Sequence, residues 1–164
     1  ASFKKSARDW LQAYADAPWV VDASAQVPTV FVNTDVEGIL GLLDSNGSAV
    51  ETKVRDLLVA QMATDVWTAV FHGAIGDLEV EPGAGPVFPT GWRGEVLREM
   101  LPDVVPGVHV EEALRQVHRR RTGDSGWVEL QTRIHYAAIR RADATKALAY
   151  VIRGLEQMNR ESET

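Results

Sequence analysis

Cysteine is absent from this 164-residue sequence, and so are long apolar runs. The lack of cysteine excludes a disulfide scaffold, thiolate metal sites of the zinc-finger kind and cysteine nucleophiles. No apolar run approaches the roughly 18–20 residues that a membrane-spanning helix needs. The first ten residues, ASFKKSARDW, lack the apolar core of a signal peptide. We therefore expect no membrane partner and no export signal, which makes the cytoplasm the default location.

The remaining composition is that of an ordinary globular protein, with 45% hydrophobic and 24% charged residues. A chain of this length buries about two-thirds of the surface that its unfolded form exposes. We expect a single globular domain over residues 1–158 and a frayed polar tail over residues 159–164.

The net charge of −6 is unevenly distributed along the chain. Residues 115–153 hold nine basic and three acidic side chains, a local charge of +6, so the rest of the chain carries −12. Such asymmetry is typical of a protein that meets an anionic partner, or of unlike faces that attract one another within or between subunits. Composition alone does not choose between these.

The N-terminal third of the chain predicts a helix followed by two strands. The apolar residues from Phe3 to Tyr14 fall on one face of an amphipathic helix. Two short β-branched and aromatic runs, at residues 19–21 and 28–32, predict a pair of strands. A cap at Asn33 or Thr34, completed by Glu37, predicts that a short helix comes next.

Ser48 and Glu51 form a second capping box, and the apolar stripe that follows predicts the longest core helix, ending near His72. Residues 73–94 are rich in glycine and proline and predict an irregular stretch with one strand at residues 78–81.

Four more helical stripes follow, at residues 92–101, 108–121, 127–139 and 147–158. Pro102 is expected to end the first stripe, and a break near Asp143 to separate the last two. The sequence therefore predicts a mainly α (α+β) fold, a single domain of five to seven helices. A small two- or three-stranded β element is expected near residues 19–33 and 78–81. Strands and helices do not alternate as a doubly wound α/β fold would require.

An arginine cluster on the C-terminal helices is the most distinctive candidate binding site. Arginine forks bind phosphate and carboxylate bidentately, and Trp127 or Tyr136 could stack on bases beside His118 and His135. The alternative is that the arginines form surface ion pairs, such as Glu129 with Arg133 or Glu111 with Arg115. The cluster contains Arg115, Arg119, Arg120, Arg121, Arg133, Arg140 and Arg141.

His72 is a candidate general base, with Asp77 or Glu79 as the carboxylate that orients it. The alternative role is structural, since a histidine in a final helical turn complements the helix dipole. Glu79 and Glu81 alternate along the predicted strand, where paired carboxylates can perform acid/base chemistry or discourage aggregation at an exposed edge.

His109 and Glu112 lie three residues apart and can share a helix face, as metal ligands do. His118 is nine residues from His109, which places it half a turn out of alignment. The sequence contains no His-Glu-x-x-His motif. We therefore expect no metal and no cofactor, and His109 stays a second weak candidate for catalysis.

Trp92 and Arg93 stand where the glycine-rich stretch meets the next helix, and residues of these types concentrate in binding hot spots. The alternative is that Trp92 closes the loop over the core.

The absence of a recognisable catalytic motif favours a non-enzymatic protein. The leading hypothesis is a binding or assembly module whose arginine cluster docks an anionic protein surface, possibly another copy of the same chain. The second hypothesis is nucleic-acid binding by the same arginines. The third is a small hydrolase or transferase that uses His72 or His109 with nearby carboxylates.

Overall fold

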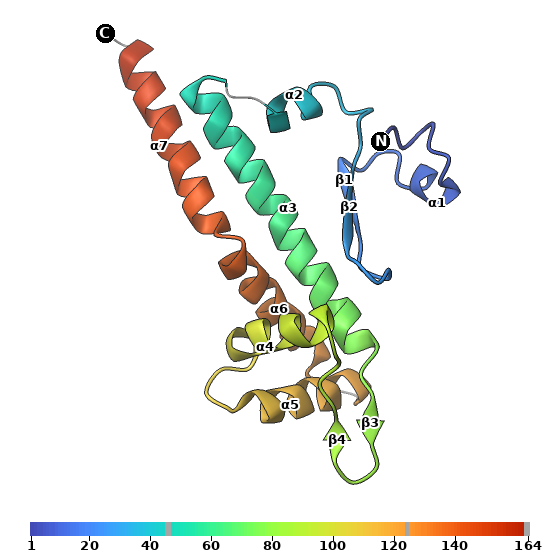
Figure 1. The fold of residues 1–164 in the computed structure, drawn as a ribbon. Helices are drawn as coiled ribbons and strands as arrows, with labels where there is room; N and C mark the ends of the chain where they lie inside the picture. The colour runs from blue at the N-terminus through green and yellow to red at the C-terminus, as the bar shows by residue number, and fades with distance from the viewer. Residues whose placement is uncertain (45–46, 124, 163–164) are drawn as a thin grey trace. The chain divides into compact units, whose positions relative to one another are not determined.

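The computed structural model describes residues 1–44, 47–123 and 125–162. Within these ranges the chain forms seven helices and four short strands, which confirms the mainly helical fold with small β elements (Figure 1). No helix of the described ranges is long and apolar enough to cross a membrane. The chain divides into two compact units, residues 1–63 with 143–164 and residues 64–142. We call the first the terminal unit and the second the central unit.

The terminal unit begins with the predicted hairpin. β1 (Trp19–Asp22) and β2 (Thr29–Val32) pair antiparallel with their ends in register. At the turn, Oδ1 of Asp22 accepts hydrogen bonds from the amide and the hydroxyl of Ser24, at 3.0 and 2.6 Å. An Asx turn of this kind stabilises the reversal of the chain.

The predicted N-terminal helix is wrong over most of its length, because only α1 (Asp9–Gln12) is helical. Side chains take the backbone donors that a longer helix would use. The amide of Lys4 donates to Asp35 at 2.9 Å, and the amide of Lys5 donates to Ser2 Oγ at 3.2 Å. These local bonds hold the first residues in an irregular path.

Asn33 is buried and holds three segments of the terminal unit together. Its Nδ2 donates to the carbonyls of Ala15 and Ala17, each at 3.0 Å. Its Oδ1 accepts the amides of Phe3 at 3.3 Å and Asp35 at 3.0 Å. The side chain is therefore fully used in joining segments far apart in sequence.

The predicted helix cap at Asn33 or Thr34 is wrong for this reason, since α2 (Ile39–Asp44) begins only at Ile39. The second capping box is confirmed. Ser48 N donates to Glu51 Oε2 at 2.7 Å, and Glu51 N donates to Ser48 Oγ at 3.3 Å. This reciprocal pair begins α3 (Ala49–Gly76), which extends four residues beyond the predicted end.

The predicted break between the last two helices is confirmed. α6 (Trp127–Arg141) ends before Asp143, whose φ of +51° interrupts the helix, and α7 (Ala144–Ser162) follows. Within the terminal unit, α7 runs antiparallel beside the first part of α3 (Figure 1). A Cβ on Gly154 would lie 3.0 Å from Lys53 Cδ, so the long Lys53 side chain of α3 reaches α7 at this glycine.

The polar end of the chain, expected to fray from Asn159, is helical through Ser162. Side-chain bonds one turn apart accompany this last stretch, including Gln157 Nε2 to Glu161 Oε1 at 3.2 Å. Residues 163 and 164 of the expected tail lie outside the described residues.

The central unit has a continuous apolar core. The second part of α3 packs with α4 (Trp92–Val104), α5 (Val110–Thr122) and α6, as Figure 1 shows. The core is filled by side chains of all four helices, including Phe71, Ile75, Leu97, Met100, Leu101, Leu114, Val117, Leu130 and Ile134.

Pro102 does not end α4, contrary to the sequence-based expectation, because the helix continues to Val104. Proline removes one backbone donor from the last turn. Leu101 and Val104 on either side are completely buried, and their packing holds that turn in place.

The glycine-rich stretch is more regular than predicted. Its first residues extend α3, and the predicted strand is present as β3 (Val80–Glu81), paired antiparallel with β4 (Gly85–Pro86). Farther on, a Cβ on Gly94 would lie 2.2 Å from the carbonyl oxygen of Pro89. Only glycine allows this loop to close against the first turn of α4.

Candidate binding face

Six of the seven arginines of the predicted cluster divide into three groups, and Arg121 has a contact of its own. The first group forms ion pairs along its own helix, as the alternative interpretation expects for Glu129 and Arg133, whereas Arg115 pairs with Glu112 instead of the expected Glu111. Arg115 Nε lies 2.9 Å from Glu112 on α5, and Arg133 Nε lies 3.8 Å from Glu129 on α6. Hydrogen bonds from Arg115 and then Gln116 hold the pKa of Glu112 below its ordinary value. Arg115 and Arg133 both remain substantially exposed.

The second group, Arg140 and Arg141, binds α4. Both guanidinium groups contact the carboxylate of Asp103, and Arg141 Nη2 lies 3.1 Å from it. Arg141 also contacts the Glu99 carboxylate and donates to the Glu99 carbonyl at 2.7 Å. Asp103 is largely buried, so these contacts join α4 to α6. Both arginines are thereby held in a structural role.

Arg121 also has an internal partner, because its Nη1 donates to the carbonyl of Ile75. That carbonyl belongs to the last turn of α3, where backbone acceptors lack partners within the helix. An arginine from α5 therefore caps the C-terminal end of α3.

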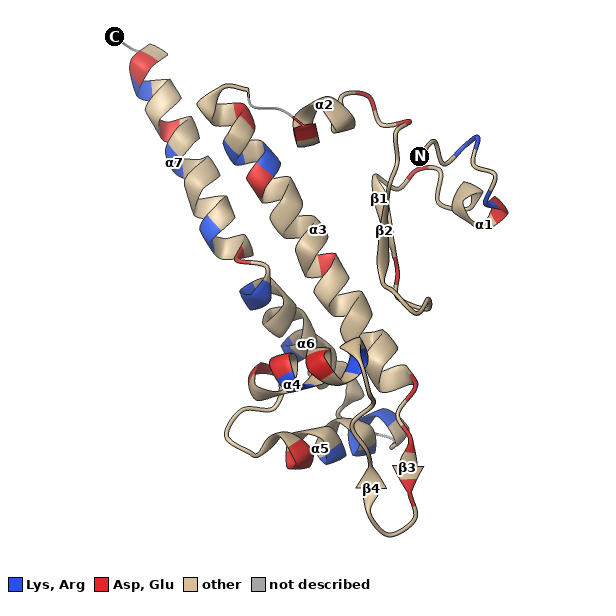
Figure 2. Cartoon of the chain, in the orientation of Figure 1, with Lys and Arg blue, Asp and Glu red and all other residues tan. Residues whose placement is uncertain are grey.

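The third group, Arg119 and Arg120, makes no ion pair with any acidic residue of the described ranges. Both lie near the end of α5, where Figure 2 shows a concentration of basic residues. The stem of Arg120 packs within 3.3 Å of the position that a Cβ on Gly126 would take, so Gly126 leaves room for it.

Arg120 and Arg133 converge from α5 and α6 on one surface hollow of about 210 Å³. The amide of Gln116 also lines it. The remaining wall is apolar and comes from the end of α4 and the turn that follows, with Val104, Val105, Pro106 and Val108. This arrangement can accept a carboxylate beside an apolar group, because arginine forks pair with planar anions.

The described contacts of His72 do not include Asp77 or Glu79, the carboxylates predicted to orient it. Burial lowers the pKa of His72, while a hydrogen bond with the Gln131 side chain acts in the opposite direction. Its ring meets that of Trp127 edge to face at 5.9 Å. Asp77 instead pairs with Arg93 at 3.2 Å. The side chain of His72, on α3, thus packs against α6, and no carboxylate is among its described contacts.

His109 is exposed at the start of α5, where Nδ1 contacts the carboxylate of Glu111. The backbone amide of Glu111 itself, and then this contact with His109, hold the pKa of the Glu111 carboxyl below its ordinary value. Across the described ranges, no three histidine, aspartate or glutamate side chains converge as metal ligands.

Trp92 and Arg93 sit beside a second hollow of about 400 Å³, of which Arg93 forms part of the lining with Asp77, Glu79 and Phe88. The Arg93 guanidinium lies over the Trp92 ring, 4.4 Å from its centroid. Trp92 itself packs against the core of the central unit. The loop-closing role therefore describes Trp92, and Arg93 is the member of the pair that faces the hollow.

Sequence reasoning missed the acidic partners of Arg140 and Arg141. Glu99 and Asp103 are four residues apart on α4, so they share one helix face. That spacing could have indicated an acidic face for a basic helix, but not which helix would meet it.

Comparison of the chain with family models, with curated proteins and with solved structures finds no match in any of the three.

Proposed function

We propose that this chain is a non-enzymatic binding or assembly module that docks an acidic protein segment through Arg119, Arg120 and Arg133. The observation that carries the proposal is the hollow in which two arginines from different helices face an apolar wall. A carboxylate can pair with the arginines while a neighbouring apolar side chain covers the valines. The partner segment can belong to another protein or to another copy of this chain.

A protein segment suits this face better than a nucleic acid does. Glu112 and Glu129 alternate with the arginines at helical spacing and would repel a continuous phosphate backbone. Of the two aromatics that could stack on bases, Trp127 packs against the central core. Tyr136 lies beneath Arg140, 5.9 Å from its guanidinium.

Catalysis by either histidine has less support. His72 has an amide and an aromatic ring as its neighbours, and His109 is exposed. Neither of them lines the two hollows of the central unit described above.

The test compares the parent chain with the variant Arg119→Glu/Arg120→Glu. The probes are a synthetic peptide of residues 77–88, which carries Asp77, Glu79 and Glu81, and a single-stranded oligonucleotide of equal charge. We expect the parent to bind the peptide and the variant to bind it on the order of tenfold more weakly, because two charges are reversed.

Lys4→Glu/Lys5→Glu is the matched control, since it makes the same change of charge at exposed positions of the terminal unit. It should bind the peptide as the parent does. An equal loss of peptide affinity in both variants would contradict the proposal, because it would mean that binding depends only on the net charge of the protein. Binding of the oligonucleotide alone, with steep salt dependence, would establish the nucleic-acid alternative instead.

A further inference from the structure

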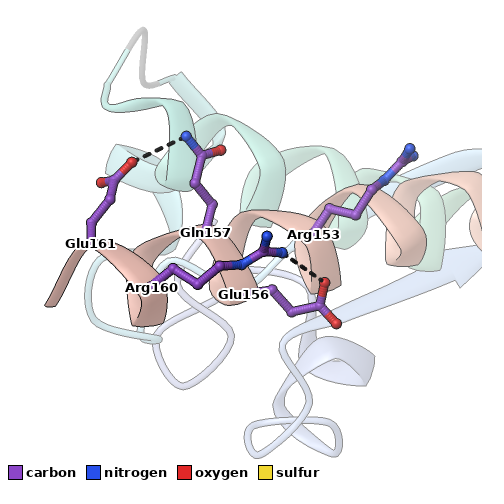
Figure 3. A pocket seen from close by; sticks show the side chains of 5 residues that line it. All are labelled: Arg153, Glu156, Gln157, Arg160 and Glu161. Atoms are coloured by element: carbon purple, nitrogen blue, oxygen red, sulfur yellow. Dashed lines mark hydrogen bonds and ion pairs between the residues drawn. The ribbon is translucent and has the colours of Figure 1, made fainter. Parts of the chain in front are cut away.

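Two hollows of the terminal unit differ in how their polar side chains are paired. The first lies along α7 and has a volume of about 540 Å³ (Figure 3). The side chains that line it contact one another, since Arg160 lies 4.0 Å from Glu156 and Gln157 donates to Glu161 at 3.2 Å. Pairing within one helix leaves this hollow without a charge that selects a ligand.

The second hollow, of about 360 Å³, is lined by two aromatic rings and a carboxylate. Trp10 comes from α1 and Tyr14 from the turn after it, Val21 and Asp22 come from β1, and Ser24 belongs to the hairpin turn. We call it the aromatic hollow. Its volume falls within the range of small-molecule sites, roughly 300–1,000 Å³.

The two rings of the aromatic hollow stand at a steep angle to each other. Tyr14 N donates to the carbonyl of Leu11 at 3.0 Å, and this turn brings the Tyr14 ring beside that of Trp10. Their centroids are 6.2 Å apart and their planes meet at 75°. Trp10 is also fixed by Phe31, which it meets edge to face at 5.4 Å. Because Trp10 and Tyr14 are 42 and 49% exposed, they form two walls that are in place before a ligand binds.

The carboxylate of Asp22 is held in one orientation by the hairpin turn. Its Oδ1 accepts hydrogen bonds from the Ser24 hydroxyl at 2.6 Å and the Ser24 amide at 3.0 Å. These bonds hold the pKa of Asp22 below its ordinary value, so the group is charged at neutral pH. In the described part of the chain, no basic side chain forms an ion pair with Asp22.

The surrounding sequence favours a cation at the aromatic hollow. Residues 9–22 contain three aspartates and no basic residue. The Arg8 guanidinium lies over the neighbouring Phe31 ring, 4.7 Å from its centroid, so one ring of this aromatic group already holds a cation. Over residues 1–44, 47–123 and 125–162, no lysine or arginine lies over Trp10 or Tyr14. These two rings are therefore open to a cation from outside the chain.

We propose that the aromatic hollow binds a quaternary ammonium group, carried by a free choline-type molecule or by a trimethylated lysine side chain. The faces of the Trp10 and Tyr14 rings and the Asp22 carboxylate attract the positive charge. The methyl groups cover the rings and the Val21 side chain, which makes the contact apolar as well as electrostatic.

A quaternary ammonium group suits the aromatic hollow better than an unmodified lysine or arginine does. Primary ammonium and guanidinium groups carry several N–H donors, each of which gives up a hydrogen bond to water on binding. The polar side chains that line the hollow are those of Asp22 and Ser24, and these two already hydrogen-bond to each other. A quaternary ammonium group has no N–H, so it leaves no donor without a partner.

This inference does not rest on the proposed function, because none of its residues belongs to the arginine hollow. The Arg119→Glu/Arg120→Glu variant should therefore bind the cation as the parent does. Failure of peptide binding and failure of cation binding are separate results.

NMR titration of the full chain with choline, at constant ionic strength, gives the first test. The indole N–H of Trp10 and the amides of Val21 and Ser24 should shift and reach saturation, with a dissociation constant on the order of a few mM. The control is the neutral isostere of choline, in which carbon replaces the nitrogen. It should shift these signals much less. Equal binding of the isostere would overturn the proposal, because the site would then select apolar surface and not charge.

Substitutions at Tyr14 and Asp22 give the second test, each with a matched control. Tyr14→Leu keeps an apolar side chain but loses the ring and should weaken choline binding about threefold, whereas Tyr14→Phe should bind as the parent does. Asp22→Asn keeps an acceptor for Ser24 but loses the charge, and should also weaken binding about threefold. Asp16→Asn makes the same change at an exposed position that does not line the hollow, and should leave binding unchanged. Equal affinities within either pair would overturn the proposal.

A short peptide that contains one trimethyllysine distinguishes the two sources of the cation. Tighter binding of this peptide than of choline would assign the aromatic hollow to a modified protein. Binding of choline at least as tight as that of the peptide would assign it to a free small molecule. The absence of saturable shifts with both probes would overturn the proposal.

Discussion

The two units contain similar proportions of apolar residues but bury their side chains to very different extents. Among the described residues, the central unit buries sixteen apolar side chains almost completely, and the terminal unit buries four. Of the large apolar residues that are exposed, twelve belong to the terminal unit and five to the central unit. The central unit therefore has a continuous core of its own, whereas the terminal unit leaves most of its large apolar side chains partly exposed.

The terminal unit is held instead by directional contacts. Asn33 joins the first residues, the segment before β1 and its own C-terminal neighbour Asp35 through four hydrogen bonds. Beside the hairpin, Trp10 meets Phe31 edge to face at 5.4 Å, and the Arg8 guanidinium lies 4.7 Å from the centre of the Phe31 ring. Contacts of this kind depend on geometry more than on buried area, so single substitutions should act differently in the two units.

The largest difference should come from removing a leucine in each unit. Leu130→Ala in the central core should lower the free energy of unfolding by about 2–5 kcal/mol, because it leaves a cavity. Leu40→Ala on α2, where the side chain is half exposed, should cost less than about 1 kcal/mol. Urea unfolding of both variants measures the difference. Equal losses would mean that the terminal unit has a core comparable to that of the central unit.

Asn33→Ala should be the most damaging single substitution in the terminal unit. It leaves two carbonyls and two amides without their partner, which should cost about 2–4 kcal/mol for groups of this kind. Hydrogen exchange should show faster exchange at the amides of Phe3 and Asp35 and no change in α5 or α6. Asn159→Ala, at an exposed position on α7, is the control. Unchanged exchange at the two amides would contradict the role given to Asn33.

The features that sequence predicted best are those fixed by local spacing. The Ser48 and Glu51 capping box, the β1–β2 hairpin and the break at Asp143 each depend on residues a few positions apart. Such patterns act before any tertiary contact forms, so they can be identified from the sequence.

The features that sequence missed depend on long-range partners. Asn33 is a residue type that commonly caps helices, but its side chain hydrogen-bonds instead to residues 16 to 30 positions away. Pro102 has the local signature of a helix end, but burial of its neighbours overrides that signature. The sequence shows that arginines are concentrated in α5 and α6. Which of these arginines have internal partners depends on Asp103 and Ile75, which no spacing within α5 or α6 can indicate.

The smallest expected difference between the units is in their response to acid. In the central unit, burial lowers the pKa of His72 from its ordinary 6.5. A histidine with a lowered pKa contributes stability above its unfolded pKa, and that contribution is lost as the pH falls toward the folded value. In the terminal unit, hydrogen bonds from the Lys4 amide and the Ser2 hydroxyl lower the pKa of Asp35 from 3.8. Its contribution is kept until the pH falls below 3.8.

Mild acid should therefore weaken the central unit first. Urea unfolding at about pH 7 and about pH 5 should show a loss of stability in the parent and a smaller loss in His72→Gln, which cannot take up the proton. Asp35→Asn should behave as the parent does over this interval and differ from it only in stronger acid. If His72→Gln kept the full pH dependence of stability, burial of the His72 imidazole would not be the cause of that dependence. The loss of stability in acid could then no longer be assigned to the packed core of the central unit.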